Sequence, residues 1–395
     1  MGTKFGTAVV KEADSFQAGS LAAKEAMKKA GSEKVNLSLV FASSVYNYSE
    51  VIRGVKEATG NAPLIGASSA GEFNEEKASK ESVGCAVISG DTHRFFLSRA
   101  DNLKGNELKG MKKAAEKLPS KVEGYPFNSA ILMMDGLTFN GDEVVLSAGE
   151  AMGPNVKIAG GAAGDDLKFE STRVFYNEES SADMAGMAMI ASKAPVAIGV
   201  QHGHSPISPP LTITKTRGNT ICEIDGKPAL EVWKEYAREK AEKAGIDVDE
   251  FTEKTLTDFF VRFEAGIHIG TGYKIRFLGG TKKTDGPLVF PGAISEGMVI
   301  RVMESPKQDQ IDSARKAAEI ALQAAGNTEI AGAVVFDCAC RNLILGDDFP
   351  KAVGEIKKTL NVPLIGFETY GEIAKEISQL SGFHQTTTVV LLIPA

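Results

Sequence analysis

The chain has 395 residues, of which 43% are hydrophobic and 24% charged, and its formal net charge is −7. This length favours two domains, and the negative net charge argues against the basic face that a nucleic-acid-binding protein needs. No apolar run reaches the ~20 residues of a membrane span, and the N-terminus lacks the apolar core of a secretion signal. We therefore expect a cytoplasmic globular protein without nucleic-acid or membrane partners.

Strand and helix patterns alternate along the first half of the chain. Asp14 is expected to cap a helix that ends at Gly31, because the alanines between them fall on one face. Two further helices are expected to end at Pro119 and Gly153. Strands are predicted over residues 5–10, 35–41, 63–65, 83–88, 94–97 and 129–134, and a polar loop over 135–141.

The second half opens with short strands and a Pro-rich stretch, residues 202–210, which is expected to be a linker or a lid rather than a strand. A hairpin with a Gly-Asn turn is predicted over residues 211–224, and Pro228 suits the first turn of the helix that follows. Further strands are predicted at 173–176, 187–190, 196–200, 274–278, 288–290, 298–303, 331–336 and 386–393, and helices at 309–325 and 349–360.

Two thirteen-residue segments, residues 61–73 and 361–373, are identical at seven positions, and residues 155–166 form a weaker third copy. In each copy a short apolar strand runs into a glycine, which permits a positive φ or a close approach of the backbone. Duplicated strand–helix–strand units of this kind predict pseudo-symmetry, with a ligand site where the strand ends meet. We predict a mixed α/β fold of two domains, residues 1–220 and 221–395, with mixed sheets flanked by helices.

One stretch of the C-terminal repeat carries side chains that suit a small polar ligand. Around residues 366–371 the sequence offers an aromatic face, a hydroxyl, a phenol and backbone amides. Glu72 and Glu372 are candidates to bind an ammonium group, and Arg341 is a candidate for bidentate binding of a carboxylate. The alternative is that the glycines form tight turns and the glutamates support them. Asp165 and Asp166 are interpreted as turn formers.

Cysteine and histidine leave two other kinds of chemistry open. Cys338 would be a nucleophile if a base lies nearby, and is otherwise an inert half-buried thiol. His202 and His204 lie on one side of an extended segment and suit a metal or haem iron, but no third ligand is visible. The chain lacks the Walker, nucleophile-elbow, zincin and kinase motifs, which counts against an enzyme, and we predict no metal site or catalytic residue.

Several segments together resemble one known family. Residues 335–341 and 363–373 resemble the signature of the FIST C-terminal domain, and residues 66–72 and 160–165 resemble the FIST N-terminal domain. Residues 224–230 resemble the join between the two. One departure is Cys340, which stands where the family pattern commonly has glycine. The resemblance implies an intracellular sensory module that binds a small ligand such as an amino acid. Some bacterial members resemble haem-based nitric-oxide sensors.

We therefore expect a small-ligand sensor for an amino acid or small carboxylate that needs no cofactor. Such a sensor would pass its signal to a separate protein, such as a histidine kinase or another regulator. The alternatives are a haem-based nitric-oxide sensor with His204 as ligand and a cysteine-dependent enzyme acting on a small metabolite. The expected ligand-binding residues are Ser68, Ser69, Glu72, Cys338, Arg341, Phe367, Thr369, Tyr370, Gly371 and Glu372.

Overall fold

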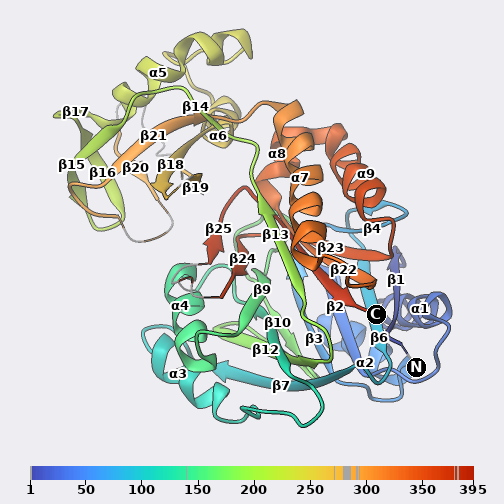
Figure 1. The fold of residues 1–395 in the computed structure, drawn as a ribbon. Helices are drawn as coiled ribbons and strands as arrows, with labels where there is room; N and C mark the ends of the chain where they lie inside the picture. The colour runs from blue at the N-terminus through green and yellow to red at the C-terminus, as the bar shows by residue number, and fades with distance from the viewer. Residues whose placement is uncertain are drawn as a thin grey trace.

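The computed structural model describes residues 2–138, 140–270, 272–278, 286–290, 292, 294–377, 379 and 382–395. Residue 139, in the predicted polar loop, lies outside them. The chain forms two bodies (Figure 1). We call residues 2–201 and 305–395 the core body, which carries both ends of the chain, and the rest, residues 202–304, the outer body. None of the described helices is long and apolar enough to cross a membrane.

Three six-stranded sheets of the same design make up the core body. In spatial order, the first contains β1 (Lys4–Val10), β6 (Val83–Ser89), β2 (Leu37–Ser43), β3 (Leu64–Ser69), β10 (Val174–Tyr176) and β11 (Glu179–Ser181). The second contains β7 (His93–Asp101), β12 (Met184–Ser192), β8 (Phe127–Met134), β9 (Lys157–Ala162), β24 (Glu372–Lys375) and β25 (Phe383–His384). The third contains β13 (Ala197–Gln201), β26 (Thr388–Pro394), β22 (Ile330–Cys338), β23 (Leu364–Thr369), β4 (Glu72–Asn74) and β5 (Ala78–Ser79).

Each sheet exchanges a two-stranded edge with another sheet. The central pairs β2–β3, β8–β9 and β22–β23 are parallel, and the strand beside each pair runs antiparallel. The first four strands of a sheet come from one stretch of chain, whereas the last two come from a different stretch. The second stretch supplies β10–β11 to the first sheet, the third supplies β24–β25 to the second, and the first supplies β4–β5 to the third. The three stretches therefore interlock in a ring.

Helices cover the outer faces of the three sheets, and the inner faces pack against one another (Figure 1). In the central cluster, the rings of Phe41 and Phe367 stack at 4.2 Å between centroids. The covering helices are α1 (Ser15–Ala30) and α2 (Tyr48–Ala58) on the first sheet, α3 (Glu107–Ala115) and α4 (Gly141–Met152) on the second, and α7 (Lys307–Ala325) and α9 (Phe349–Leu360) on the third, with α8 (Ala339–Leu345) and a 3-10 turn (Gly346–Asp348) between them.

The repeated glycines lie where two backbone segments approach each other closely. This is one of the two roles that the sequence predicted for them, the other being a positive φ. Leu64 and Leu364 open equivalent strands, β3 and β23. A Cβ at Gly66 would lie 1.8 Å from the Val40 carbonyl oxygen, and a Cβ at Gly160 would lie 1.8 Å from that of Leu132. Because any side chain here would collide with the neighbouring strand, the parallel pairs require glycine at these positions.

The outer body has its own sheet and hydrophobic core. Trp233 is fully buried in this core and donates from Nε1 to the Phe263 carbonyl oxygen at 2.8 Å. The strands are β14 (Ser205–Pro206), β15 (Leu211–Arg217), β16 (Thr220–Ile224), β17 (Lys227–Pro228), β18 (Phe263–Ile269), β19 (Gly272–Arg276), β20 (Leu288–Val289) and β21 (Val299–Glu304), and the helices are α5 (Ala229–Lys243) and α6 (Glu253–Arg262).

The predicted mixed α/β class is confirmed, as is the β15–β16 hairpin with Gly218 at a φ of 61° in its turn. One local prediction was wrong, because Ser205 and Pro206, in the expected linker, pair with β21. Helix α6 was not predicted. The core body takes β13 from the middle of the chain and β26 from its C-terminal end into one sheet. The strands and buried residues therefore group into the core body and the outer body. The predicted division of the chain into two domains at residue 220 stays a prediction.

Candidate ligand-binding site

The ends of β3, β9 and β23 meet at the centre of the core body, where the three sheets converge. Three backbone hydrogen bonds join these ends in a ring, and each runs from one repeated segment to another. They are Ala70 N to Glu368 O at 3.0 Å, Tyr370 N to Ala162 O at 3.1 Å, and Gly164 N to Ser68 O at 2.9 Å. The glycine-bounded strand ends thus lie together, and the side chains beside them share one region of the molecule.

Two buried carboxylates, Glu72 and Glu372, lie just beyond this ring in equivalent positions. Glu72 accepts hydrogen bonds from the hydroxyls of Ser69 and Ser82. Glu372 accepts from Thr369 Oγ1 at 2.5 Å and from the backbone N–H of Thr387 at 3.1 Å. Burial raises the pKa of Glu72 to about 8 and raises that of Glu372 well above its ordinary value. Both glutamates therefore contact the turns from inside, in line with the alternative interpretation, and neither lines a cavity formed by the described residues.

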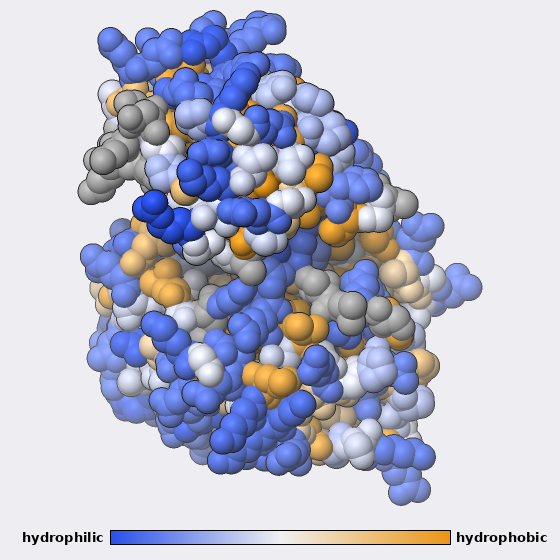
Figure 2. Space-filling view, turned by 90° about the vertical axis from the view of Figure 1, so that its left-hand side faces the viewer, coloured by the Kyte–Doolittle hydropathy of each residue, from blue (hydrophilic) through white to orange (hydrophobic). Residues whose placement is uncertain are grey.

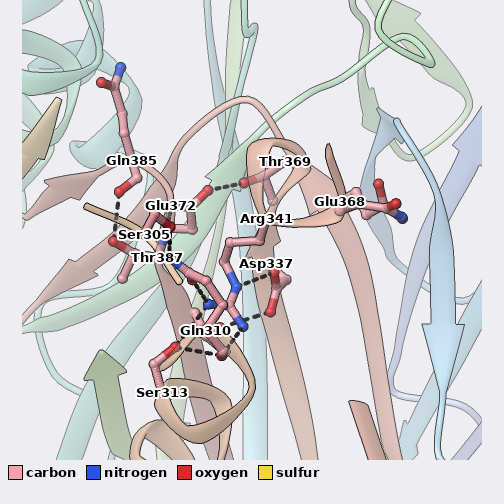
Figure 3. A network of polar contacts seen from close by, with 12 residues as sticks. Ser305, Gln310, Ser313, Asp337, Arg341, Glu368, Thr369, Glu372, Gln385 and Thr387 are labelled. Carbon is pink, nitrogen blue, oxygen red and sulfur yellow. Dashed lines mark hydrogen bonds and ion pairs between the residues drawn. The ribbon is translucent and has the colours of Figure 1, made fainter. Parts of the chain in front are cut away.

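Arg341 has its donors occupied within the core body (Figure 3). Its guanidinium is fully buried and donates from Nε to Asp337 at 2.7 Å and from Nη1 to Ser313 at 2.8 Å. It also contacts the side chain of Gln310 and donates to the backbone carbonyl of that residue at 3.0 Å. Arg341 therefore joins β22, α8 and α7, and its expected role with a ligand carboxylate stays a prediction.

His204 does not fit the role of a haem ligand. Its Nε2 lies 2.8 Å from Glu264 Oε2, and both side chains are fully buried. Its Nδ1 lies 3.4 Å from Gln310 Nε2. Burial lowers the pKa of His204 to about 3 and raises that of Glu264 to about 8. Both groups are therefore neutral, and protein side chains lie against both ring nitrogens that iron would need.

A cavity of about 390 Å³ lies between the two bodies. We call it the interbody cavity, and Figure 2 shows a recess between the bodies with hydrophobic residues on its margins. No side chain in its described lining carries a formal charge at neutral pH. The core body contributes Gly136, Leu137, Leu167, Phe169, Cys338, Ala339, Cys340, Leu343, Thr369, Tyr370 and Gln385, and the outer body contributes Asn219, Thr257, Phe277, Val289 and Phe290.

An aromatic pair forms part of the cavity wall. The rings of Phe169 and Tyr370 stack at 4.7 Å between centroids with an interplanar angle of 18°. Tyr370 donates its hydroxyl to Asp165 Oδ1 at 2.5 Å, and burial together with this carboxylate raises the pKa of the phenol. Gln385 accepts a hydrogen bond from the Phe277 N–H at 2.8 Å across the two bodies. The wall therefore combines flat apolar surface with a few polar groups.

The thiol of Cys338 lies in the same wall but is not activated. Burial, with the neighbouring Cys340 thiol, raises its pKa well above the ordinary value. A thiol nucleophile needs a lowered pKa or an adjacent base. The buried Glu372 carboxyl lies beside this thiol and also has a raised pKa, so the thiol forms a neutral part of the cavity surface.

The segment of residues 165–173 was not recognised in the sequence beyond its two aspartates. Asp165 accepts hydrogen bonds from the backbone N–H groups of Phe169, Glu170 and Ser171 at 2.9, 2.7 and 2.8 Å. Asp166, Leu167 and Phe169 have φ values of 55°, 64° and 54°. Non-glycine residues adopt such angles rarely, and they cluster at ligand sites when surrounding contacts hold them. The only feature of the sequence that marked this segment was the pair of carboxylates that follows Gly164.

The structure divides the predicted site residues into two groups. Cys338, Thr369 and Tyr370 line the interbody cavity. Gly371 lies against the Phe383 ring, because a Cβ there would come 2.2 Å from Phe383 Cζ. The remaining residues are buried in the core body and line no described cavity: Ser68, Ser69, Glu72, Arg341, Phe367 and Glu372. The outer-body half of the lining was missed, because sequence repeats mark only the core body.

Two family models match the chain in succession. The FIST N domain matches residues 36–227 and the FIST C domain matches residues 229–375. An uncharacterized protein of Methanocaldococcus jannaschii is 24% identical over 275 residues, which cover 67% of this chain and 52% of that protein. This chain thus spans about half the length of that relative. A cyanuric acid hydrolase from A. caulinodans matches with a TM-score of 0.28 and 10% identity, over 49% of this chain and 72% of that one.

Proposed function

Because this chain belongs to the FIST family, we propose that it is a small-ligand sensor whose ligand binds in the interbody cavity. FIST domains are sensory domains that bind small ligands in signalling. The proposal rests on one observation: residues of both bodies form the wall of the cavity. A ligand that contacts both bodies at once stabilises one arrangement of the two bodies over the others. The resulting change in arrangement is the signal.

The chemistry of the wall favours a neutral, flat and mainly apolar ligand. Phe169 and Tyr370 offer a stacking surface, and Thr369, Gln385 and Asn219 offer hydrogen-bonding groups. Transfer of a charged group into such a site without a partner is costly. An aromatic heterocycle with one or two polar atoms matches this wall. An amino acid or small carboxylate, which the sequence suggested, lacks a charged partner among the described lining residues.

Contacts between the bodies provide a route from the ligand to the outer surface. Asp142 on α4 accepts from Lys274 at 2.7 Å and from Arg276 at 2.6 Å, both on β19. Thr386 donates to Glu264 at 2.7 Å. A ligand that changes the spacing of the bodies would change these contacts. A separate regulator, such as a histidine kinase, would then recognise the outer surface in only one placement.

We also infer that the three interlocked stretches are one repeated unit used three times. The supporting observation is the shared strand order, with a parallel central pair and an exchanged edge in every sheet. The interbody cavity breaks this symmetry. It forms where the outer body meets the core body, and the outer body is inserted only in the third stretch, between β13 and α7. One site per chain is therefore expected.

A thermal-shift screen tests the proposed site. Indole and other neutral heteroaromatic probes form one arm, and amino acids and small carboxylates form the other. A ligand that binds only the folded protein raises the free energy of unfolding by about 2.7 kcal/mol when its concentration is a hundredfold above its Kd. Leu343→Trp fills the cavity, whereas Leu146→Trp alters an equally exposed leucine on α4 as the control (44% and 40% exposed).

The expected result is stabilisation of the wild type and of Leu146→Trp by neutral aromatic probes, with the shift lost in Leu343→Trp. Stabilisation by the charged arm alone, or equal shifts in both tryptophan variants, would remove the interbody cavity as the site. A screen with no shift in either arm at millimolar concentrations would count against ligand sensing altogether.

A further inference from the structure

A second cavity, of about 590 Å³, lies on the other side of the segment 165–173. We call it the polar cavity. Alternate positions of this segment line the two cavities: Leu167 and Phe169 face the interbody cavity, while Lys168, Glu170 and Arg173 line the polar one. The remaining lining of the polar cavity is almost entirely hydroxyl and amide groups, from Ser44, Tyr46, Asn47, Tyr48, Ser49, Ser171 and Ser180.

The charges in the polar cavity are unequally satisfied. Asp165 also lines it, but its oxygens already accept three backbone N–H groups and the Tyr370 hydroxyl. Lys168 donates to the Ser44 hydroxyl at 2.8 Å, and that hydroxyl in turn donates to Asp166. The Arg173 guanidinium has no acidic partner within 4 Å among the residues that the structure describes. Glu170 is exposed and lies outside this hydrogen-bonded set. Of the two cations in this lining, Arg173 is therefore the one that the carboxylates of Asp165, Asp166 and Glu170 leave without a direct partner among the described residues.

The backbone holds Arg173 in place for binding. Its N–H donates to Ser68 Oγ at 2.9 Å, and its carbonyl accepts from the Ser68 N–H at 2.8 Å. The start of α2 adds to the positive potential, since the cap Asn47 and the first residues Tyr48 and Ser49 all line the cavity. The positive end of a helix dipole and an arginine together suit an oxyanion.

We propose that the polar cavity binds a small molecule through an oxyanion, a carboxylate or phosphate group, held by Arg173 and Lys168. Its occupancy acts on the interbody cavity through the Asp165–Tyr370 hydrogen bond. An anion that draws Arg173 and Lys168 inward acts on the same short segment that carries Phe169. Because Asp165 fixes that segment and also accepts from Tyr370, both walls respond together. The binding step does not depend on the proposed function, whereas the coupling step does.

Calorimetric titration tests the oxyanion site. Wild-type protein is titrated with inorganic phosphate and, separately, with succinate, both at constant ionic strength in chloride. We expect binding of at least one, weakened tenfold or more in Arg173→Gln and also weakened in Lys168→Gln. The matched control is Arg217→Gln, an exposed arginine on β15 without an acidic partner within 4 Å among the described residues, and it should bind like the wild type.

The phosphate and succinate arms identify which kind of oxyanion the site prefers. Absence of heat in both arms would overturn the site. Equal weakening in Arg217→Gln would also overturn it, because binding would then reflect general charge. If Arg173→Gln does not fold, judged by its melting temperature, Lys168→Gln alone decides.

The coupling is measured separately, as the change in indole affinity on adding the bound oxyanion at saturation. We expect a change of threefold or more in the wild type that is lost in Tyr370→Phe. An indole affinity that ignores the oxyanion would refute the coupling and leave the anion site standing. Failure of indole to bind would instead count against the interbody site, so the two failures can be distinguished.

Discussion

Single residues in the core body show that hydroxyl groups, rather than cations, hold the buried glutamates. Ser69 contacts Glu72, and Thr369 contacts Glu372 in the same way. Both pairs come from the repeated segments, so their chemistry was visible in the sequence. Their role was not, because only the fold shows that the carboxylates point inward. Burial without a cation disfavours the charged form, and the pKa of each glutamate rises for that reason.

The buried glutamates predict that stability decreases as the pH rises from about 6.5 to 8, because below this range the buried histidines, whose pKa values are lowered from 6.5, act in the opposite direction. Glu72 has its pKa raised from 4.5 to about 8 by burial, so between these values the folded protein holds a proton that the unfolded chain releases. One such group lowers the unfolding free energy by up to about 1.4 kcal/mol per pH unit. Glu264 and Glu368 have similarly raised pKa values and act in the same direction.

Urea unfolding of the wild type and of Glu72→Gln at pH 5, 6.5 and 8 checks this expectation. Glutamine keeps the shape and stays neutral, so the variant should lose less stability between pH 6.5 and 8 than the wild type. The surface variant Glu150→Gln on α4 is the control and should follow the wild type. A wild type that gains stability toward pH 8 would contradict neutral buried glutamates.

At the scale of elements, glycine positions decide how closely strands and rings pack. Gly371 does not need a positive φ, and the expectation that it is structural rests on the Phe383 ring alone. By contrast, Gly354 lies in α9, and a Cβ there would meet nothing within 4 Å. The two glycines therefore predict opposite effects of the same substitution.

Gly371→Ala should lower the melting temperature, because overpacking a core typically costs about 1–3 kcal/mol. Gly354→Ala should raise it, since alanine is favoured over glycine in a helix by up to about 1 kcal/mol. Thermal unfolding of both variants without ligand provides the measurement. Equal effects, or stabilisation by Gly371→Ala, would show that the Phe383 ring can move aside at no cost.

The elements that could be predicted were those whose signals are local. Residues 349–360 form a helix as predicted, and residues 211–224 form the predicted hairpin. The exchanged edges could not be predicted, because β4 pairs with β23 almost 300 residues away. The partners of Arg341 are likewise remote in sequence: Gln310 and Ser313 lie on α7. From the sequence alone, a charged side chain in a motif is easily taken for a ligand-binding group, because its hydrogen-bond partners lie far away in the sequence.

At the scale of the whole molecule, the interbody cavity depends on how the outer body is attached. The chain leaves the core body after β13 and returns at α7, so two connections join the bodies. Asp142 reinforces them by accepting from Lys274 and Arg276, whose side chains are almost fully buried. Neither the insertion nor this contact is marked in the sequence, because Asp142 lies more than 130 residues from both Lys274 and Arg276.

Asp142→Asn should loosen the outer body without unfolding the core body. It leaves two buried cations facing an amide, and the partly exposed carboxylate suggests a loss of about 1–3 kcal/mol. Hydrogen exchange should therefore become faster at the interface, in β19 and β25, and stay unchanged in β2 and β3. The control is Glu150→Gln on the same helix. Unchanged exchange at β19 would show that Asp142 does not hold the bodies together.

The most direct test of the interbody site is a crystal structure of the wild-type protein grown with indole, or with the strongest neutral probe from the screen. We predict density for the probe between the Phe169–Tyr370 pair of the core body and Phe290 of the outer body, and none in Leu343→Trp crystals grown the same way. Density confined to another part of the molecule, or an interbody cavity without the probe while calorimetry shows binding, would contradict a sensor that works between its two bodies.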